Sequence, residues 1–368
     1  MDVQQVRENM MSLWKETFGD SSEYISLVFN NYFNPKFISF FEEGGVVKSS
    51  LMGIPYDFVS KTGRTLQGLY LCGLATKKDS RRRGIMTRLL DQINIKAEEE
   101  GFDFTFLIPS GEGIRRYYRD CGYQDAFYLK KEYYVRGHDF KSDIKLSCSR
   151  YDIERKNQIT DFLCKYGTSV FNRDSAYILA HSRKDWEIVL DETLISNGHV
   201  FIGQSENSIC AVAFAEVSER EIAIKKLIVS DSEFKNAFLK CLSSEYAAHN
   251  ITLVKDLEEI IEGGVSNQLW SPFYAQNNGK KAEYEDIAVI VEPFNESLNA
   301  YSFGMINIFD IKKLLIKAGI DNLDSLNTYS EEEIKQLVLR KPVGSNGDAL
   351  ENVLNLPEIN FSMSLLLE

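Results

Sequence analysis

The stretch LCGLATKKDSRRRGIMTRLL, residues 71–90, decides the fold. It completes an apolar run over residues 65–76 that is typical of a buried central strand, and it leads at once into a helix whose apolar residues recur at every fourth position from Ile85. The basic loop between the two ends at Gly84. The free amides of a first helical turn and the helix dipole favour an anion, and a glycine lets it approach the backbone closely. The sequence therefore predicts a phosphate-binding loop at residues 77–84.

Three consecutive arginines, Arg81 to Arg83, add positive charge to this loop. At the N-terminus of a helix with no anion bound, such charge would oppose the helix dipole and destabilise the helix. The loop is not a Walker loop, which needs Gly-Lys-Ser/Thr, nor a dinucleotide fingerprint, which needs three glycines. The arginines thus favour a bound anion over a merely solvated helix end.

The segments around the loop predict alternating helices and strands. Residues 4–33 have helical spacing with a break at 18–21, and a hairpin turn at 42–45 interrupts strand-like residues 36–59. After the loop helix come a strand at 102–109, a short helix at 114–122 and a strand at 127–135.

The middle third repeats this order more faintly. Residues 199–217 predict a hairpin, 221–229 a strand, 233–250 a helix and 251–255 a strand, but the connection before the helix is Ser-Asp-Ser. We expect a duplicated unit that lacks the loop chemistry. Residues 305–319 and 330–340 predict helices, and the apolar end of the chain, residues 356–368, is expected to insert into the protein. The predicted domains are 1–145, 146–290 and 291–368.

Composition and charge exclude several classes. With 42 Lys and Arg against 54 Asp and Glu, the net charge of the 368-residue chain is -12, which argues against nucleic acid or a membrane surface as a partner. No apolar run reaches the length of a membrane span and no secretion signal begins the sequence, so that a cytoplasmic protein is expected. The six cysteines and four histidines have no metal-ligand spacing, and we expect free thiols and no metal.

Two motifs resemble those of the GCN5-related N-acetyltransferase (GNAT) family. Residues 81–86, RRRGIM, are similar to its coenzyme A pyrophosphate loop, R-x-x-G-x-G/A, although Met86 stands where a small residue is usual. Residues 117–123, YYRDCGY, are similar to its tyrosine motif, and the two lie one helix and one strand apart. The resemblance covers residues 1–135, and RRRGIM is similar to the enhanced-intracellular-survival (Eis) type.

This resemblance implies an α+β fold with tandem acyl-CoA N-acyltransferase units, mixed central sheets flanked by helices, and a small C-terminal α/β domain, a reduced form of a sterol-carrier-like domain. It implies that Tyr118 is the general acid and that the C-terminal carboxylate of Glu368 supplies the base. From the residues themselves we expect Tyr117 to lie in the core, and Glu112, beside the end of the cofactor strand, is the reserve base. The implied acetyl-CoA site comprises Leu74, Ala75 and Thr76 for the pantetheine arm and Arg82, Arg83, Gly84, Ile85, Met86 and Thr87 for the pyrophosphate.

The implied function is transfer of acetyl from acetyl-CoA to a primary amine by direct attack in a ternary complex. The acceptor is a small cationic amine, an aminoglycoside-like molecule, or a peptide lysine or N-terminus. Two alternatives stay open, a non-catalytic acyl-CoA-binding regulatory module and a tandem acyltransferase of the Fem or N-myristoyl kind. The sequence leaves the choice between a monomer and a homo-oligomer open.

Overall fold

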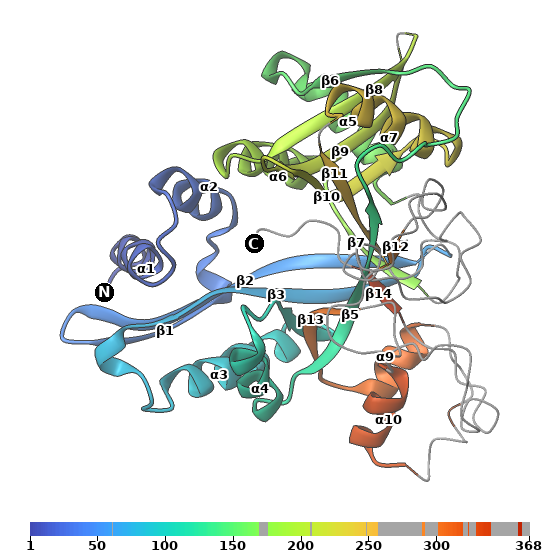
Figure 1. Cartoon of the computed structure of the whole chain (residues 1–368). Helices are drawn as coiled ribbons and strands as arrows, with labels where there is room; N and C mark the ends of the chain where they lie inside the picture. The colour runs from blue at the N-terminus through green and yellow to red at the C-terminus, as the bar shows by residue number, and fades with distance from the viewer. Residues whose placement is uncertain are drawn as a thin grey trace, which may run out of the picture.

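The computed structural model describes residues 1–60, 62–168, 176–206, 208–247, 249–256, 289–290, 301–318, 323, 329–339 and 360–362. Within these ranges one 14-stranded sheet runs through the molecule, and helices cover its two faces (Figure 1). The prediction of an α+β fold with mixed sheets flanked by helices is confirmed.

The first third of the chain builds the part of the sheet that carries the loop. Its elements are α1 (Val3–Phe18), α2 (Ser22–Tyr32), η1 (Pro35–Phe37), β1 (Ile38–Glu43), β2 (Val46–Ser60), β3 (Thr65–Thr76), η2 (Lys78–Ser80), α3 (Ile85–Glu99), β4 (Phe104–Leu107), α4 (Glu112–Asp120) and β5 (Gln124–Tyr134). Side chains of α1 and α2 are buried against one face of β2 and β3, and those of α3 and α4 against the other. The predicted break at 18–21 and the turn at 42–45 are confirmed, because glycines with positive φ occupy both.

The middle third forms a second unit with the predicted order. Its elements are β6 (Ser147–Arg150), η3 (Ile153–Arg155), α5 (Lys156–Tyr166), β7 (Ala176–Ala180), α6 (Arg183–Ile195), β8 (His199–Ser205), β9 (Ser208–Val217), β10 (Glu221–Val229), α7 (Glu233–Glu245) and β11 (Asn250–Asp256). β10 and β11 pair in parallel, as β3 and β4 do. Asp231 and Glu233 stand where the first unit has arginines, so that this helix start repels an anion.

The remaining described elements are short: β12 (Val289–Ile290), β13 (Tyr301–Ile308), α9 (Ile311–Lys317), α10 (Glu331–Val338) and β14 (Asn360–Ser362). The prediction of a helix over residues 305–319 is wrong for its first part, because residues 305–308 belong to β13 and only α9 is helical. The helix predicted from residue 330 is confirmed, with its Ser330 capping box. The sterol-carrier-like character of this region stays a prediction.

Strands from different segments of the chain pair with one another. β5 pairs with β13 through residues 124–129 and with β11 through residues 129–134, so that it belongs to both halves of the sheet (Figure 1). β13 lies between β4 and β5 although it follows β5 by more than 160 residues. The predicted domain limits are not tested by this topology, yet elements from all three segments share one sheet.

Candidate functional site

The site begins where β3 leaves β4. These parallel strands pair only from Gly68 opposite Phe104 to Tyr70 opposite Phe106, while β3 continues to Thr76. The register with β2 shifts in this stretch, so that Gly73 and Leu74 together face one residue of β2, a β-bulge. Gly73 has φ +62°. No described strand pairs with this edge of β3 beyond Tyr70, so its backbone N–H and C=O groups are available to an extended ligand, which would bind as an added strand.

The loop after β3 brings the start of α3 to this edge. Gly84, the N-cap of α3, is left-handed with φ 67° and provides no side-chain cap, so the first-turn amides are free of a capping side chain. A Cβ at Gly84 would meet no atom within 4 Å, which leaves room for a ligand against the backbone. Arg82 is also left-handed, with φ 62°, a strained conformation for a residue with a side chain. These features fit a bound pyrophosphate.

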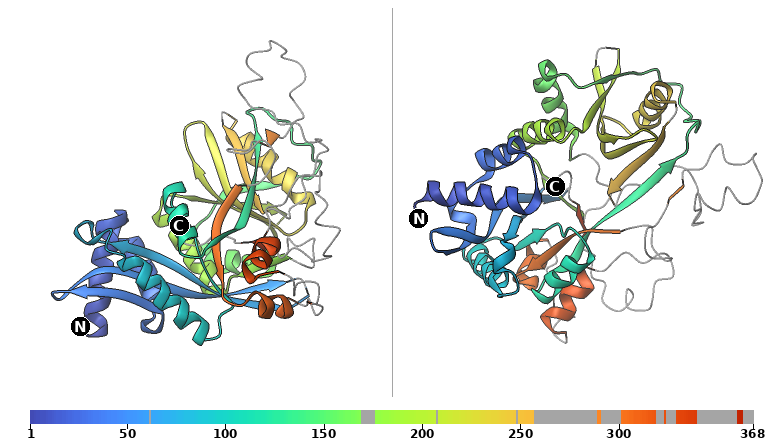
Figure 2. Two further views of the ribbon diagram at one scale, coloured as in Figure 1. Left: turned by 90° about the horizontal axis from the view of Figure 1, so that it is seen from below. Right: turned by 60° about the vertical axis from the view of Figure 1, so that its left-hand side comes forward.

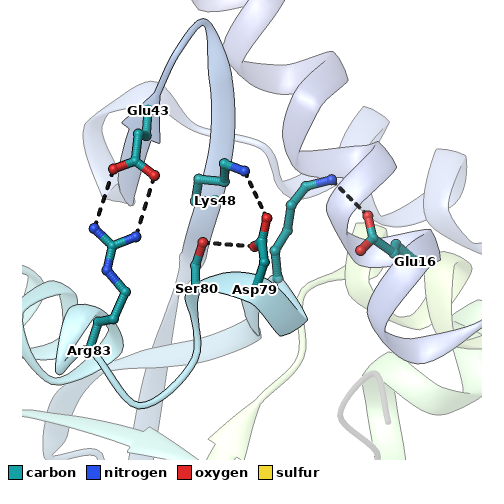
Figure 3. Close-up of polar contacts among 7 residues, drawn as sticks. Glu16, Glu43, Lys48, Asp79, Ser80 and Arg83 are labelled. Carbon is teal, nitrogen blue, oxygen red and sulfur yellow. Dashed lines mark hydrogen bonds and ion pairs between the residues drawn. The ribbon is translucent and has the colours of Figure 1, made fainter.

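Ion pairs hold the loop to its neighbours (Figure 3). Arg83 reaches Glu43 at the β1–β2 turn with both of its NH groups, each 3.3 Å from an oxygen. Asp79 accepts from Lys48 of β2 at 3.0 Å and from Ser80 at 2.8 Å, and the loop's Lys77 lies 2.8 Å from an oxygen of Glu16 in α1. The guanidinium of Arg83 lowers the pKa of Glu43, and Ser80 and Lys48 lower that of Asp79, so both carboxyls are ionised at neutral pH.

Unlike Arg83, the other two arginines of the loop lie at a cavity. Arg81 and Arg82 line a cavity, and Arg81 donates its Nε–H to the carbonyl of Thr76 at 3.0 Å. Among the described residues, no acidic group forms an ion pair with Arg82. The loop therefore directs its uncompensated positive charge at the cavity, where an anionic ligand would balance it.

The cavity has a volume of about 830 Å³. Its wall combines residues of the loop, of β3, of α4 and of the two N-terminal helices. Leu74, Thr76, Arg82 and Met86, all predicted to bind the cofactor, line it together with Tyr118. The structure thus brings the two sequence motifs to one space.

The other predicted cofactor residues lie around the cavity rather than on its wall. Ala75 is buried, and its carbonyl accepts from the Ser49 hydroxyl at 3.1 Å. Ile85 packs in the core under α3, so that only its backbone is available to a ligand. Thr87 lies one turn into α3 and shares a hydrogen bond of 3.1 Å with the hydroxyl of Tyr117. Arg83 would have to leave Glu43 to reach a ligand.

The two tyrosines of α4 differ in their hydrogen bonds. The prediction that Tyr117 is the core residue is wrong: Tyr118 is 7% exposed and belongs to the buried cluster, whereas Tyr117 is partly buried and pairs with Thr87. A helix turns by about 100° per residue, so adjacent tyrosines face different neighbours, which the sequence motif alone does not identify. Among the described residues the Tyr118 hydroxyl has no hydrogen-bond partner, although it lies on the cavity wall.

Burial controls the protonation of the groups on this wall. Removal from water, and secondarily the neighbouring Tyr123, raises the pKa of Tyr118 far above its usual value, so the phenol keeps its proton at neutral pH. Burial raises the pKa of the Cys72 thiol to about 12. Cys72 is therefore a neutral thiol and a poor nucleophile, although it lines the cavity.

The far wall consists of residues that the sequence analysis did not assign to the site. Trp14, Phe18 and Tyr24 line it, and their helical spacing had indicated only a core. Asp20 is the acidic residue on the described wall, and its Oδ2 accepts from the Trp14 indole at 2.6 Å. The one sequence signal for this wall is an acidic residue, Asp20, directly after a helix that ends in aromatic residues, but nothing in the sequence places Asp20 opposite the loop.

Of the two predicted bases, Glu112 lies among the described residues and Glu368 does not. Glu112 begins α4, two residues before Ile114 of the cavity wall. Glu368 lies outside the described residues, and its role stays a prediction. In the described part of the chain no group of three His, Cys, Asp or Glu side chains could hold a metal ion, and no helix there is both long and apolar enough to cross a membrane.

Part of the chain is similar to a known family. Residues 4–126 match the family model of the acetyltransferase (GNAT) domain. No curated protein matches the chain.

Solved structures share the fold over most of the chain. A conserved protein from Enterococcus faecalis, described as a probable N-acyltransferase, is 13% identical with a TM-score of 0.62 over 85% of this chain and 73% of its own. A GCN5-related N-acetyltransferase from Anabaena variabilis is 10% identical with a TM-score of 0.59 over 85% and 73%. Eis1 from Mycobacterium abscessus is 11% identical with a TM-score of 0.59 over 86% and 74%. At such identities the likeness concerns the fold.

Proposed function

We propose that this protein transfers acetyl from acetyl-CoA to a primary amine, a proposal supported by the match of residues 4–126 to the family model of the acetyltransferase (GNAT) domain. The observation that carries the proposal is the Tyr118 hydroxyl, which has no hydrogen-bond partner among the described residues and lies on the wall of a cavity that extends to Arg82 and to β3 beyond its pairing with β4. Acetyl-CoA, when bound, supplies the activated acetyl group and a thiolate leaving group.

Different residues bind the pantetheine arm and the pyrophosphate of acetyl-CoA. The backbone of residues 74–76 holds the pantetheine arm along the edge of β3, because β4 no longer pairs with it there. Arg82 and the amides from Gly84 to Thr87 hold the pyrophosphate at the start of α3. Arg83 contributes when it exchanges Glu43 for a phosphate oxygen.

Tyr118 donates the proton that the departing thiolate needs. Its raised pKa suits a donor that must still hold its proton when the reaction begins. The neutral thiol of Cys72 makes an acyl-enzyme route unfavourable, which supports direct attack by the amine in a ternary complex. Glu368 is the proposed base, with Glu112 as the alternative.

The far wall supports a cationic acceptor. Trp14 occupies one oxygen of Asp20, and no cation pairs with this carboxylate among the described residues, so the other oxygen is available to an ammonium group. The aromatic rings of Trp14, Phe18 and Tyr24 surround the same space and favour a cation. The net charge of -12 attracts such a molecule over longer distances.

The deciding experiment measures free thiol release from acetyl-CoA across a panel of amines: diamines and polyamines, aminoglycosides, lysine peptides and neutral amines of similar size. We expect turnover with cationic acceptors and little with neutral ones. Acetyl-CoA binding without turnover on any amine would instead support the non-catalytic regulatory module.

A further inference from the structure

Helix α6 connects the second unit to the first. It follows β7, which pairs with β2 from Ser60 opposite Tyr177 to Asp57 opposite Ala180. Only residues 181 and 182 separate β7 from α6. The start of α6 is therefore fixed to the first unit's sheet, although the helix precedes the second unit's hairpin in the chain.

The same helix packs in two cores. Ile188 is buried among residues of α1, α2 and β2, whereas Trp186, Val189 and Leu190 are buried under β8 and β9 of the second unit. A helix that fills two cores cannot shift without opening one of them, because interiors are close-packed. The second unit thus supports α6 rigidly against the first.

From this position α6 contacts α2 (Figure 2). The Tyr32 hydroxyl at the end of α2 donates to Asp185 Oδ1 at 3.1 Å, and Lys184 Nζ donates to the Asn31 carbonyl at 3.2 Å. The other oxygen of Asp185 accepts from the Ser182 backbone N–H at 2.8 Å and from the Ser182 hydroxyl at 2.6 Å, and the Asp185 N–H donates to the Ser182 hydroxyl at 3.2 Å, which completes the capping box of α6. Asp185 therefore ties the end of α2 to the start of α6.

Tyr32 also has a buried tyrosine as a neighbour, Tyr56 of β2, which is 6% exposed. Burial and the neighbouring Asp185 charge raise the pKa of Tyr32, so that the phenol stays a donor to the carboxylate. The hydrogen bond to an ionised acceptor is of the stronger kind.

The face of α2 that carries Tyr32 also reaches the cavity. Tyr24, Val28 and Tyr32 are spaced four residues apart and share one side of the helix. Tyr24 and Val28 line the cavity beside Trp14 and Asp20. A movement of the Tyr32 end would therefore move the far wall, which the proposed function assigns to the acceptor.

We propose that Asp185 of the second unit is a positioning residue for the acceptor amine: through Tyr32 it fixes α2, and with α2 the acceptor wall of the cavity. The second unit, which lacks the phosphate loop, contributes to the reaction in this way. This inference rests on the proposed function in one respect, the assignment of the far wall of the cavity to the acceptor amine.

The test compares three full-length variants with the parent protein. Tyr32→Phe removes only the hydroxyl, and Asp185→Asn removes the charge that it faces. Asp191→Asn is the matched control, since this aspartate also lies on α6 but pairs with Lys156 of α5, away from α2. We expect the first two to raise the KM for the amine by about tenfold, the scale of one hydrogen bond to a charged group. The Kd for acetyl-CoA and kcat should stay within about threefold of the parent.

Hydrogen exchange of the unliganded proteins gives a readout that needs no activity. Tyr32→Phe and Asp185→Asn should speed exchange of the amides of residues 22–32, whereas Asp191→Asn should leave them unchanged. Two results would overturn the proposal if the parent protein is active. One is that Tyr32→Phe and Asp185→Asn leave the KM for the amine unchanged, and the other is that Asp191→Asn raises this KM equally. If the parent has no activity with any amine, the proposed function fails, and exchange in α2 alone decides whether Asp185 positions this helix.

Discussion

At the scale of residues, the site depends on which groups are already paired. Tyr117 and Arg83 have polar partners within the protein, whereas their sequence neighbours on the cavity wall do not: among the described residues, the Tyr118 hydroxyl has no hydrogen bond and Arg82 has no ion pair. A paired group must lose an interaction before it serves a ligand, and this lowers its net contribution.

Tyr118→Phe tests the proton donor. The substitution should lower kcat by about 10²–10⁴-fold, the usual contribution of general acid catalysis, with little change in the KM for acetyl-CoA. Tyr117→Phe, which loses only its bond to Thr87, should have a much smaller effect on kcat. Steady-state kinetics of both variants decide, and equal losses would show that the assignment to Tyr118 is wrong.

Arg82→Ala tests the phosphate loop. Removal of a charge-assisted contact should weaken acetyl-CoA binding by about tenfold or more, measured by calorimetry. Arg83→Ala should weaken it less, because Arg83 first has to leave Glu43. Glu43→Gln should then tighten binding slightly by freeing Arg83. Unchanged affinity in Arg82→Ala would contradict the proposed pyrophosphate site.

At the scale of elements, the bulge in β3 is shaped by a contact with α1. A Cβ at Gly73 would lie 2.4 Å from the ring of Trp14, so that the indole rests directly on the glycine backbone. The indole also donates to Asp20. One side chain of α1 thus contacts the strand proposed for the cofactor and the carboxylate proposed for the acceptor.

Gly73→Ala tests this contact against a matched glycine. Gly63 also has positive φ, +82°, but no atom lies within 4 Å of its would-be Cβ. Both substitutions strain the backbone, whereas only Gly73→Ala also displaces Trp14. We expect Gly73→Ala to reduce kcat/KM by at least about tenfold and Gly63→Ala to lower Tm alone. Similar kinetics in the two variants would argue against a role for the indole contact.

The elements differ in how well the sequence predicts them. Strand β3 and helix α3 were predictable because their apolar spacing, glycine stop and loop composition agree locally. The strand at residues 305–308 was not, because its conformation depends on pairing with β4 and β5, which are distant in the chain. The place of Asp20 on the far wall of the cavity was not predictable for the same reason, since only tertiary packing brings α1 opposite the loop.

At the scale of the whole molecule, buried thiol and phenol groups make the free energy of unfolding fall at alkaline pH. Burial raises the pKa of Cys72 to about 12, against about 8.5 in an unfolded chain, and raises those of Tyr56 and Tyr118 above the usual value near 10. The folded state therefore holds these protons more tightly, so stability is full at lower pH and falls as the pH rises through this range.

The prediction is a urea midpoint that begins to fall above about pH 8.5 and falls more steeply above about pH 10. Cys72→Ala should flatten the first part of this decline and Tyr118→Phe the second, measured by urea unfolding at a series of pH values. A midpoint constant to pH 11 in the parent protein would contradict the assigned burial of these groups.

The position of β13 has a consequence for synthesis. The strand that separates β4 from β5 leaves the ribosome more than 160 residues after β5, which at usual translation rates is roughly 10–30 s later. During this interval the nascent first unit exposes two strand edges that invite pairing with other chains. A fragment of residues 1–145 should therefore aggregate when expressed alone, and co-expression with the remaining chain should rescue it. The first unit thus comes first in the sequence but is among the last parts of the protein to finish folding.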